Sequence, residues 1–394
     1  MNAMQELDRL RPIFRPIDPQ MEMDNNEMIP SPRSLRTAAS HLAHKMLYGH
    51  LADLRPMPTE MIDDGPKRSV YRYRPPEGVV PAGPPVLFVP PLAAPARCYD
   101  LRRGCSLAEH TVNAGRLSYL LDYGPIGYAD RELGFEEWVG EVLPGAIRTV
   151  SADAGGQPVQ LVGWCLGGIF ALLTAAADPD LPIASVAAIA TPIDTAAVRL
   201  AAPLRPIARL TGGIEAGVVG ALFGGLPQPL VKRSYQLIGI DKYLLRPYKM
   251  LTNLDNREFL EQIEAIDHFT DSMLAYPGRT AEQIYRGLFK DNALAGEGLA
   301  VGGRRIRLQD VRVPVLAIAG RGDGIAPVAA VRPLRALLTG APQVRFEVAA
   351  GGHLGVLTGR SAMRTTWVHL DRWLDEGTVR HGIRPQRREA LASV

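Results

Sequence analysis

Cys165, Asp323 and His353 are the residues whose types and surroundings could do covalent chemistry. Cys165 lies in Gly163-Trp164-Cys165-Leu166-Gly167-Gly168, between an apolar run that predicts a buried strand and one that predicts a helix. This is the strand–turn–helix context of the G-x-S-x-G nucleophile motif, with cysteine in place of serine. The adjacent helix N-terminus would favour a thiolate and an oxyanion. The alternative is a structural cysteine in a glycine-rich turn.

A nucleophilic cysteine needs a base, and the base needs a group that orients it. Asp323 follows the strand predicted at 314–319, in the turn Gly320-Arg321-Gly322-Asp323-Gly324. His353 follows the last predicted strand, in Gly351-Gly352-His353-Leu354-Gly355. The order nucleophile, acid, histidine is that of the α/β-hydrolases, although Asp323 alone could also be an ordinary turn aspartate. The other histidines lie in helical or tail contexts, and Cys98 and Cys105 lack the elbow, so we expect structural roles for them.

An oxyanion formed at Cys165 would need backbone N–H donors. The residue after the nucleophile, Leu166, should supply one, and the loop after the strand ending at Val89 should supply the other. Pro90 and Pro91 cannot donate, so the second donor is Leu92 or Ala93, of which we favour Ala93.

The elements that must position these residues alternate between strands and helices. This alternation predicts an α/β fold of the α/β-hydrolase type, a mostly parallel sheet with helices on both faces, whose chemistry gathers at the carboxyl ends of the strands. Strands are predicted at 70–74, 85–89, 117–122, 158–163, 186–191, 314–319 and 344–348, and helices at 34–54, 135–150, 169–177 and 367–374.

Residues 195–310 break the alternation with a helical, aromatic-bearing segment that leaves and re-enters the sheet, so we expect an inserted cap over the site. The predicted organisation is an N-terminal arm and helix at 1–66, a core at 67–194 and 311–376, this cap at 195–310, and a basic C-terminal tail at 377–394.

Composition excludes several classes of function. The 394 residues carry a net charge of +3, too small to argue for nucleic acid, and three cysteines that suit a reducing, cytoplasmic setting with no metal site. We see no signal peptide, and the most apolar stretch, 214–231, is interrupted by Glu215 and two prolines, so no transmembrane segment is expected.

The cysteine also bears on the type of reaction. An acyl group on a cysteine is a thioester, close in energy to a coenzyme A thioester, so loading from coenzyme A is nearly isoenergetic. Such an intermediate suits transfer to a second nucleophile, which favours an acyltransferase over a hydrolase that uses water. Because many cysteine hydrolases exist, hydrolysis stays open.

Taken together, the residues resemble the catalytic subunit of polyhydroxyalkanoate synthases, especially the short type that works with a second subunit. The resemblance runs from about Tyr71 to Leu374 and is carried chiefly by the cysteine box and the Gly-Gly-His-x-Gly loop. Further matching motifs are Val89-Pro90-Pro91, Asp100-Leu101-Arg102 with Ser106-Leu107, Asp122-Tyr123-Gly124, Thr191-Pro192-Ile193-Asp194, Lys290-Asp291-Asn292, Gly302 to Leu308, and Pro314-Val315-Leu316.

The resemblance implies polyester synthesis from (R)-3-hydroxyacyl-coenzyme A. Cys165 would carry the growing chain as a thioester, and His353 would deprotonate the thiol. Asp323 would either orient His353 or help it activate the 3-hydroxyl of the incoming unit. Coenzyme A enters as part of the substrate and no bound cofactor is implied. A second synthase subunit or a homodimer is the expected partner, and the surface of polyester inclusions a possible location.

The chain departs from the family beside the expected oxyanion loop. Where the family usually has Asn, a basic residue and Tyr-Tyr, this chain has Ala93-Ala94-Pro95-Ala96-Arg97, and its Asp122-Tyr123-Gly124 replaces Asp-Trp-Gly. The alternative enzyme is therefore a thioesterase or lipase on the same scaffold. A non-catalytic binding subunit is the third hypothesis, and the complete Cys, Asp and His set argues against it.

Overall fold

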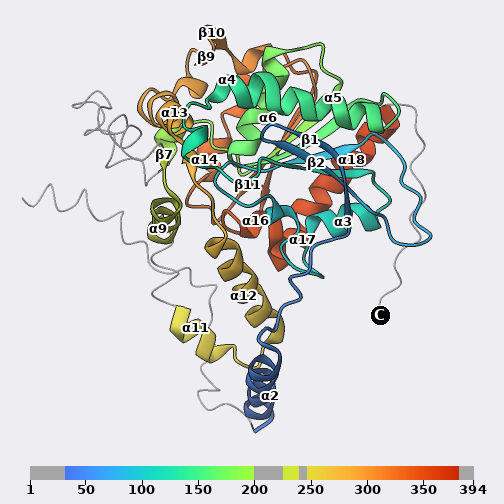
Figure 1. Ribbon diagram of the computed structural model, residues 1–394, viewed down its shortest axis with the longest axis vertical. Coiled ribbons are helices and arrows are strands. Elements are labelled where there is room, and N and C mark those ends of the chain that lie inside the picture. Colours follow the sequence, from blue (N-terminus) through green and yellow to red (C-terminus); the bar gives the residue numbers. More distant parts are fainter. Residues whose placement is uncertain (1–31, 199–224, 239–245, 381–394) are drawn as a thin grey trace, which may run out of the picture.

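An eight-stranded sheet forms the centre of the computed structural model, which describes residues 32–198, 225–238 and 246–380 (Figure 1). The strand order is β1-β2-β4-β3-β5-β6-β11-β12. Strands β4, β3, β5, β6, β11 and β12 run parallel, and β2 and β1 extend the edge in antiparallel pairs. The bounds are β1 (Thr59–Gly65), β2 (Arg68–Tyr73), β3 (Val86–Val89), β4 (Ser118–Asp122), β5 (Val159–Trp164), β6 (Ile183–Ile189), β11 (Val315–Gly320) and β12 (Val344–Ala349).

The central strands are buried along their whole length because helices cover both faces of the sheet. Every residue of β3, β5 and β11 is buried. Their near-continuous apolar sequences are what a parallel strand covered on both sides requires. Gln160, the polar exception in β5, donates from Nε2 to the Leu374 carbonyl oxygen at 3.3 Å. The strands predicted from these apolar runs are confirmed.

Helices lie on both faces of the sheet (Figure 1), with α4, α5 and α6 on one side and α3, α16 and α17 on the other. The predicted fold class, an α/β-hydrolase fold with a mostly parallel sheet, is confirmed. The bounds of the helices on the sheet are α3 (Leu107–Asn113), α4 (Phe135–Glu137), α5 (Leu143–Asp153), α6 (Leu166–Ala177), α14 (Val328–Val331), α15 (Leu334–Leu337), α16 (Gly355–Thr358), α17 (Arg360–Arg364) and α18 (Thr366–Arg380).

The described residues between β6 and β11 form a mostly helical insertion. Helix α2 (Pro32–Tyr48) lies beside it rather than on the sheet (Figure 1), with Lys45 paired to Glu264 at 3.1 Å and His41 bonded to the Leu254 carbonyl at 3.0 Å. The elements of the insertion are β7 (Gly225–Leu226), α9 (Gln228–Ile238), α11 (Arg246–Thr252), α12 (Arg257–Asp271), β8 (Tyr276–Pro277), α13 (Gly278–Gln283), a π-helical turn (Ile284–Lys290), β9 (Leu299–Val301) and β10 (Arg304–Ile306).

Asn292 joins the later part of the insertion to its start. Its Oδ1 accepts a hydrogen bond from the Thr195 amide at 2.8 Å, and its Nδ2 donates to Asp194 Oδ1 at 2.8 Å. Asn292 adopts a left-handed backbone conformation with φ of 50°, which asparagine tolerates better than most residues. The motifs at 191–194 and 290–292 therefore meet just after β6, and β9 and β10 lie between Asn292 and the return of the chain at β11.

The structure differs from the expected elements at the N-terminal side. Strand β1 is not predicted from the sequence, and the helix expected at 34–54 ends at Tyr48. No helix among the described ranges is both long and apolar enough to cross a membrane. The arm at 1–31, much of the apolar stretch at 214–231 and the tail beyond Arg380 lie outside the described residues, and the domain boundaries stay a prediction.

Candidate active site

Cys165 lies at a sharp turn between β5 and α6. Its backbone has φ of 55° and ψ of −121°, a conformation that L-residues rarely adopt, and the residue is 9% exposed. Strained backbone of this kind concentrates at functional sites. The geometry is that of the nucleophile elbow that the sequence predicts, in which the turn lifts the side chain away from the strand.

The glycines around Cys165 are required by close backbone contacts. A Cβ atom at Gly163 would lie 2.6 Å from Gly168 Cα, so the strand and helix could not pack as they do. A Cβ at Gly167 would lie 2.1 Å from the Val89 carbonyl oxygen. A Cβ at Gly168 would lie 2.0 Å from Thr191 Oγ1, which belongs to the loop after β6. The box thus packs the elbow against the ends of β3 and β6.

His353 and Asp323 are joined by a hydrogen bond. His353 Nδ1 donates to Asp323 Oδ2 at 2.8 Å, and the two side chains are 9% and 0% exposed. The other carboxylate oxygen, Oδ1, accepts the amides of Ile325 and Ala326, each at 2.8 Å. Both oxygens of Asp323 are therefore occupied, and the imidazole is held by its Nδ1 side.

Cys165 influences the protonation of the His353 ring. Burial disfavours the charged imidazole, but the charges of Cys165 and Asp323 and their side-chain hydrogen bonding outweigh this, and raise the pKa of His353 to about 10. His353 Nε2 is buried and has no well-formed hydrogen bond, so the thiol interaction lacks ideal geometry. Burial of Asp323 opposes its ionisation, but His353 and two backbone amides lower the pKa of that carboxyl.

Trp164, the residue before Cys165, contacts the histidine loop. Its indole Nε1 donates to the His353 carbonyl oxygen at 3.1 Å, and its ring centroid lies 5.0 Å from that of the imidazole. Phe269 at the end of α12 lies 6.4 Å from the same indole. Sequence reasoning missed these contacts, because nothing in the pattern around 164 indicates a partner near 269 or 353.

The expected oxyanion donors lie at the carboxyl edge of the sheet. Leu166 is the first residue of α6, and Ala93 lies in the loop after β3 with φ of 63°. Ala190, directly after β6, has φ of 48°. The adjacent strands β3, β5 and β6 are thus each followed by a non-glycine residue in strained backbone, at Ala93, Cys165 and Ala190. Whether Leu92 or Ala93 donates stays a prediction.

The other two cysteines are buried, as expected of structural thiols. Cys98 and Cys105 are 0% and 1% exposed, and burial raises the pKa of both. Next to Cys98, the Tyr99 hydroxyl lies 2.8 Å from the Val89 carbonyl oxygen and 2.9 Å from that of Val162. This hydroxyl bridges the strands that lead to the oxyanion loop and to Cys165.

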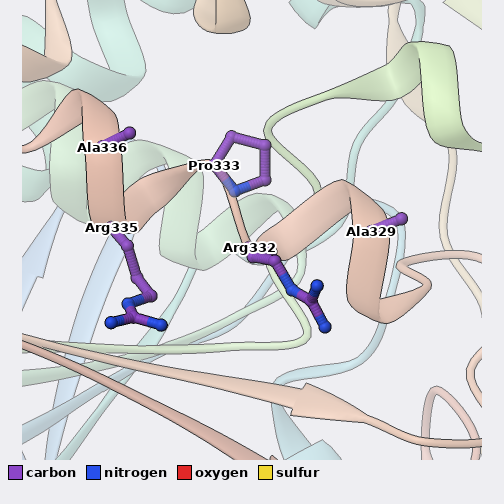
Figure 2. A pocket seen from close by; sticks show the side chains of 5 residues that line it. All are labelled: Ala329, Arg332, Pro333, Arg335 and Ala336. Atoms are coloured by element: carbon purple, nitrogen blue, oxygen red, sulfur yellow. The ribbon is translucent and has the colours of Figure 1, made fainter.

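Two hollows lie elsewhere on the protein. One of about 590 Å³ is lined by Ala329, Arg332, Pro333, Arg335 and Ala336, with both guanidinium groups extending to the same side of α14 and α15 (Figure 2). Another of about 620 Å³ is lined by residues between Arg279 and Arg305. Neither is lined by Cys165, Asp323 or His353. In the described ranges, no group of three or more His, Cys, Asp or Glu side chains is arranged to hold a metal ion.

Comparison with known proteins gives one consistent likeness in sequence. The chain is 24% identical over 365 residues to the poly(3-hydroxyalkanoate) polymerase subunit PhaC of Allochromatium vinosum, covering 92% of this chain and 99% of that one. It is 23% identical to the Thiocystis violacea subunit, with coverages of 92% and 99%, and 24% identical to that of Synechocystis, with coverages of 81% and 84%. No family model matches the chain.

Solved structures resemble the chain more loosely. MenH from S. aureus has a TM-score of 0.48 and 15% identity, and the matched region covers 78% of this chain and 98% of MenH. A thermophilic esterase from Thermogutta terrifontis has a TM-score of 0.47 and 14% identity, with coverages of 82% and 100%.

The resemblance that the motifs indicated is therefore confirmed by whole-chain similarity. Over most of its length, this chain is similar to the poly(3-hydroxyalkanoate) polymerase subunits named PhaC.

Proposed function

We propose that this chain is an acyltransferase that forms polyester from (R)-3-hydroxyacyl-coenzyme A through a thioester on Cys165. The observation that carries the proposal is the arrangement of His353. Its Nδ1 is bonded to Asp323, Cys165 raises the pKa of the same ring, and the buried Nε2 has no well-formed hydrogen bond. Sequence similarity to polymerase subunits supports the product class.

In the first step, Nε2 of His353 takes the proton of the Cys165 thiol, and the thiolate attacks the thioester carbonyl of the substrate. The oxyanion that forms would be stabilised by the backbone N–H groups of Leu166 and of Ala93 or Leu92. Collapse breaks the bond to the coenzyme A sulfur, which leaves with the proton from His353. The acyl group is then a thioester on Cys165.

In the second step, a 3-hydroxyl group attacks the acyl–Cys165 thioester, forming the ester bond and releasing the Cys165 thiol. His353 accepts the hydroxyl proton and returns it to the departing sulfur. Because both oxygens of Asp323 are occupied by His353 and backbone amides, the contacts favour Asp323 as the residue that orients the imidazole. A direct role would require the substrate hydroxyl to reach a carboxylate whose side chain is 0% exposed.

The test is incubation with radiolabelled (R)-3-hydroxybutyryl-coenzyme A, followed by separation of polymer from free acid. We expect polymer and one coenzyme A released per unit from the wild type. Cys165→Ala should lose at least about 10³-fold in rate, as removal of a covalent nucleophile does. Cys98→Ala, which removes a buried thiol outside the elbow, is the matched control.

Two outcomes would contradict the proposal. Coenzyme A release at the wild-type rate by Cys165→Ala would exclude the thioester route. Free hydroxy acid without polymer would instead identify a thioesterase. A second synthase subunit, a homodimer and the inclusion surface stay predictions, and adding a purified synthase partner subunit to the same incubation would test the first.

A further inference from the structure

Trp164 is next to Cys165 in sequence and contacts His353 in space. It ends β5 directly before Cys165, is 3% exposed, and reaches the histidine loop through its indole N–H. The contact spans 189 positions of sequence, so it joins the central strand to the last loop of the sheet. A buried indole N–H needs an acceptor, and the acceptor here is the backbone of His353 itself.

The loop that carries His353 is rich in glycine and needs an external contact to fix it. Gly351 has φ of 120°, and a Cβ there would lie 2.8 Å from the backbone of Gly355, so glycine is required for the fold of the loop. Glycine also leaves more backbone conformations accessible than any other residue. The hydrogen bond from Trp164 Nε1–H fixes the backbone carbonyl of His353, the residue in this loop whose ring takes part in the proposed chemistry.

The indole also supports the ring of His353. The two centroids are 5.0 Å apart with an interplanar angle of 38°, so the two rings pack against each other in a tilted arrangement. A cation over an indole face is attracted by the ring quadrupole within about 6 Å. The imidazolium that forms when His353 takes the thiol proton is a cation within this distance, so the contact favours the thiolate–imidazolium pair.

We propose that Trp164 is a positioning residue, which holds His353 so that Nε2 faces Cys165 and which transmits the position of α12 to the histidine through Phe269. The inference rests on the proposed function of Cys165 and His353. Phe269 is buried near the end of α12, and its ring centroid lies 6.4 Å from that of the indole. Among the ring contacts of the described residues, Trp164 is therefore the link between the insertion and His353.

Two substitutions separate the parts of this role. Trp164→Phe keeps an aromatic face and removes the N–H donor, and Trp164→Leu removes both. Trp367→Phe is a matched control, because Trp367 is equally buried, donates to the Leu357 carbonyl at 2.9 Å and lies 4.8 Å from the ring of His110. The wild type and the three variants are compared as full chains. The measurements are the unfolding temperature, the turnover rate, and the alkylation of Cys165 by iodoacetamide, with the modified residue located by mass spectrometry.

We expect kcat to fall about tenfold in Trp164→Phe and about a hundredfold in Trp164→Leu, with KM little changed, since a small misplacement of a catalytic group costs up to about 10²-fold. Cys165 alkylation at pH 7 should slow in the same order, and its pH profile should move to higher pH in Trp164→Leu, because thiolate formation depends on the imidazolium partner. Trp367→Phe should change neither.

The inference is overturned if both Trp164 variants keep the wild-type alkylation profile, or if their rates fall no more than that of Trp367→Phe at equal folded fraction. Alkylation needs no acyl substrate, so it separates this inference from the proposed function. Normal activity in Cys165→Ala would end the proposed function, whereas unchanged alkylation in Trp164→Leu would end only the positioning role.

Discussion

The amide nitrogen of Leu274 donates a 2.7 Å hydrogen bond to the carbonyl oxygen of Ala93. This bond holds the strained loop after β3 against the insertion, three residues beyond the end of α12. Phe269, in the last turn of α12, contacts Trp164, with 6.4 Å between the ring centroids. One short stretch of the insertion, 269–274, therefore contacts both the expected oxyanion loop and the residue beside the nucleophile, so any movement of α12 reaches both halves of the site.

The titration of His353 should depend on Cys165. Burial lowers the pKa of His353, and the charge of Cys165 is the largest influence that raises it, to about 10. Cys165→Ala removes that charge, so we expect the pKa of His353 to fall. NMR titration of isotopically labelled histidine would measure this, with Cys98→Ala as the control. An unchanged midpoint would show that the thiol does not act on the ring.

Stability should fall as the solution becomes alkaline. The pKa of His353 is raised from 6.5 to about 10 on folding, so its contribution to the free energy of unfolding is complete below pH 6.5 and is lost as pH rises through 10. Urea unfolding between pH 6.5 and 10 should show this decline, and it should be weaker in Cys165→Ala. Equal slopes in the two proteins would contradict the assignment.

Substitution of the elbow glycines should be costly in proportion to the contacts they make. Gly167→Ala places a Cβ 2.1 Å from the Val89 carbonyl, so we expect a loss of about 1–3 kcal/mol in the free energy of unfolding. Gly140→Ala, an exposed helical glycine with nothing within 4 Å of the added Cβ, should be stabilising by about 0.5–1 kcal/mol. Denaturant unfolding measures both, and similar losses would refute the packing argument.

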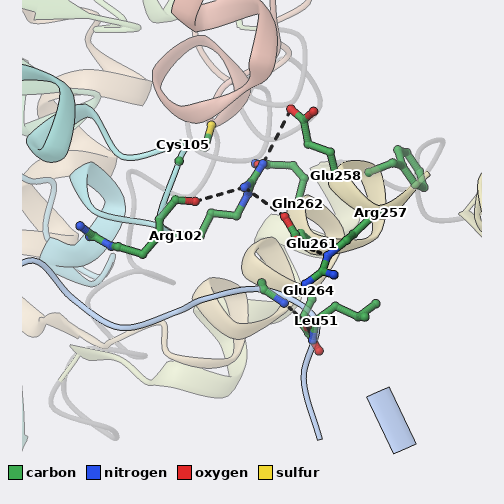
Figure 3. Close-up of polar contacts among 12 residues, drawn as sticks. Leu51, Arg102, Cys105, Arg257, Glu258, Glu261, Gln262 and Glu264 are labelled. Carbon is green, nitrogen blue, oxygen red and sulfur yellow. Dashed lines mark hydrogen bonds and ion pairs between the residues drawn. The ribbon is translucent and has the colours of Figure 1, made fainter. Parts of the chain in front are cut away.

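Arg102 should hold α12 to the core through its side-chain bonds (Figure 3). Its side chain is 6% exposed and bonds Gln262 at 3.1 Å and Glu261 at 3.5 Å. Arg102→Met removes the donor that bonds Gln262 and one of the two arginines that bond Glu261, so we expect a loss of about 1–3 kcal/mol and faster amide hydrogen exchange in α12.

Arg257 provides the matched control for Arg102. It pairs with the same Glu261 at 2.8 Å, but its side chain is 53% exposed and it lies on α12 itself. Arg257→Ala should change stability by less than about 0.5 kcal/mol and leave exchange in α12 unaltered. If the two substitutions had equal effects on exchange, Arg102 would not hold the helix to the core.

Much of the fold follows from local sequence, and the exceptions have physical reasons. The central strands are apolar because both their faces are covered, so hydrophobic runs locate them. Strand β1 has the sequence Thr-Glu-Met-Ile-Asp-Asp-Gly and lies at the edge, where ion pairs join Arg68 to Asp63 and Arg72 to Glu60. Such a strand carries no hydrophobic signal. The helix expected at 34–54 ends at Tyr48 because Gly49 follows it in a left-handed conformation with φ of 77°, which closes the last turn.

The candidate site divides in the same way. The elbow could be predicted because Cys165 and its glycines form one continuous motif between two apolar runs, and Asp323 and His353 because each follows a strand of a parallel sheet. The contacts of Trp164 with His353 and Phe269, and of Leu274 with Ala93, join segments far apart in sequence. Only the folded chain brings these residues together, so no local sequence pattern predicts their contacts.

The bonds of Asn292 to both Asp194 and Thr195 hold together the two ends of the chain segment between positions 195 and 292. The entropic cost of closing a loop grows only with the logarithm of its length, so residues can be gained or lost between these positions at little cost to the sheet. The length and sequence of that segment can therefore vary without disturbing the strand and helix on either side of Cys165.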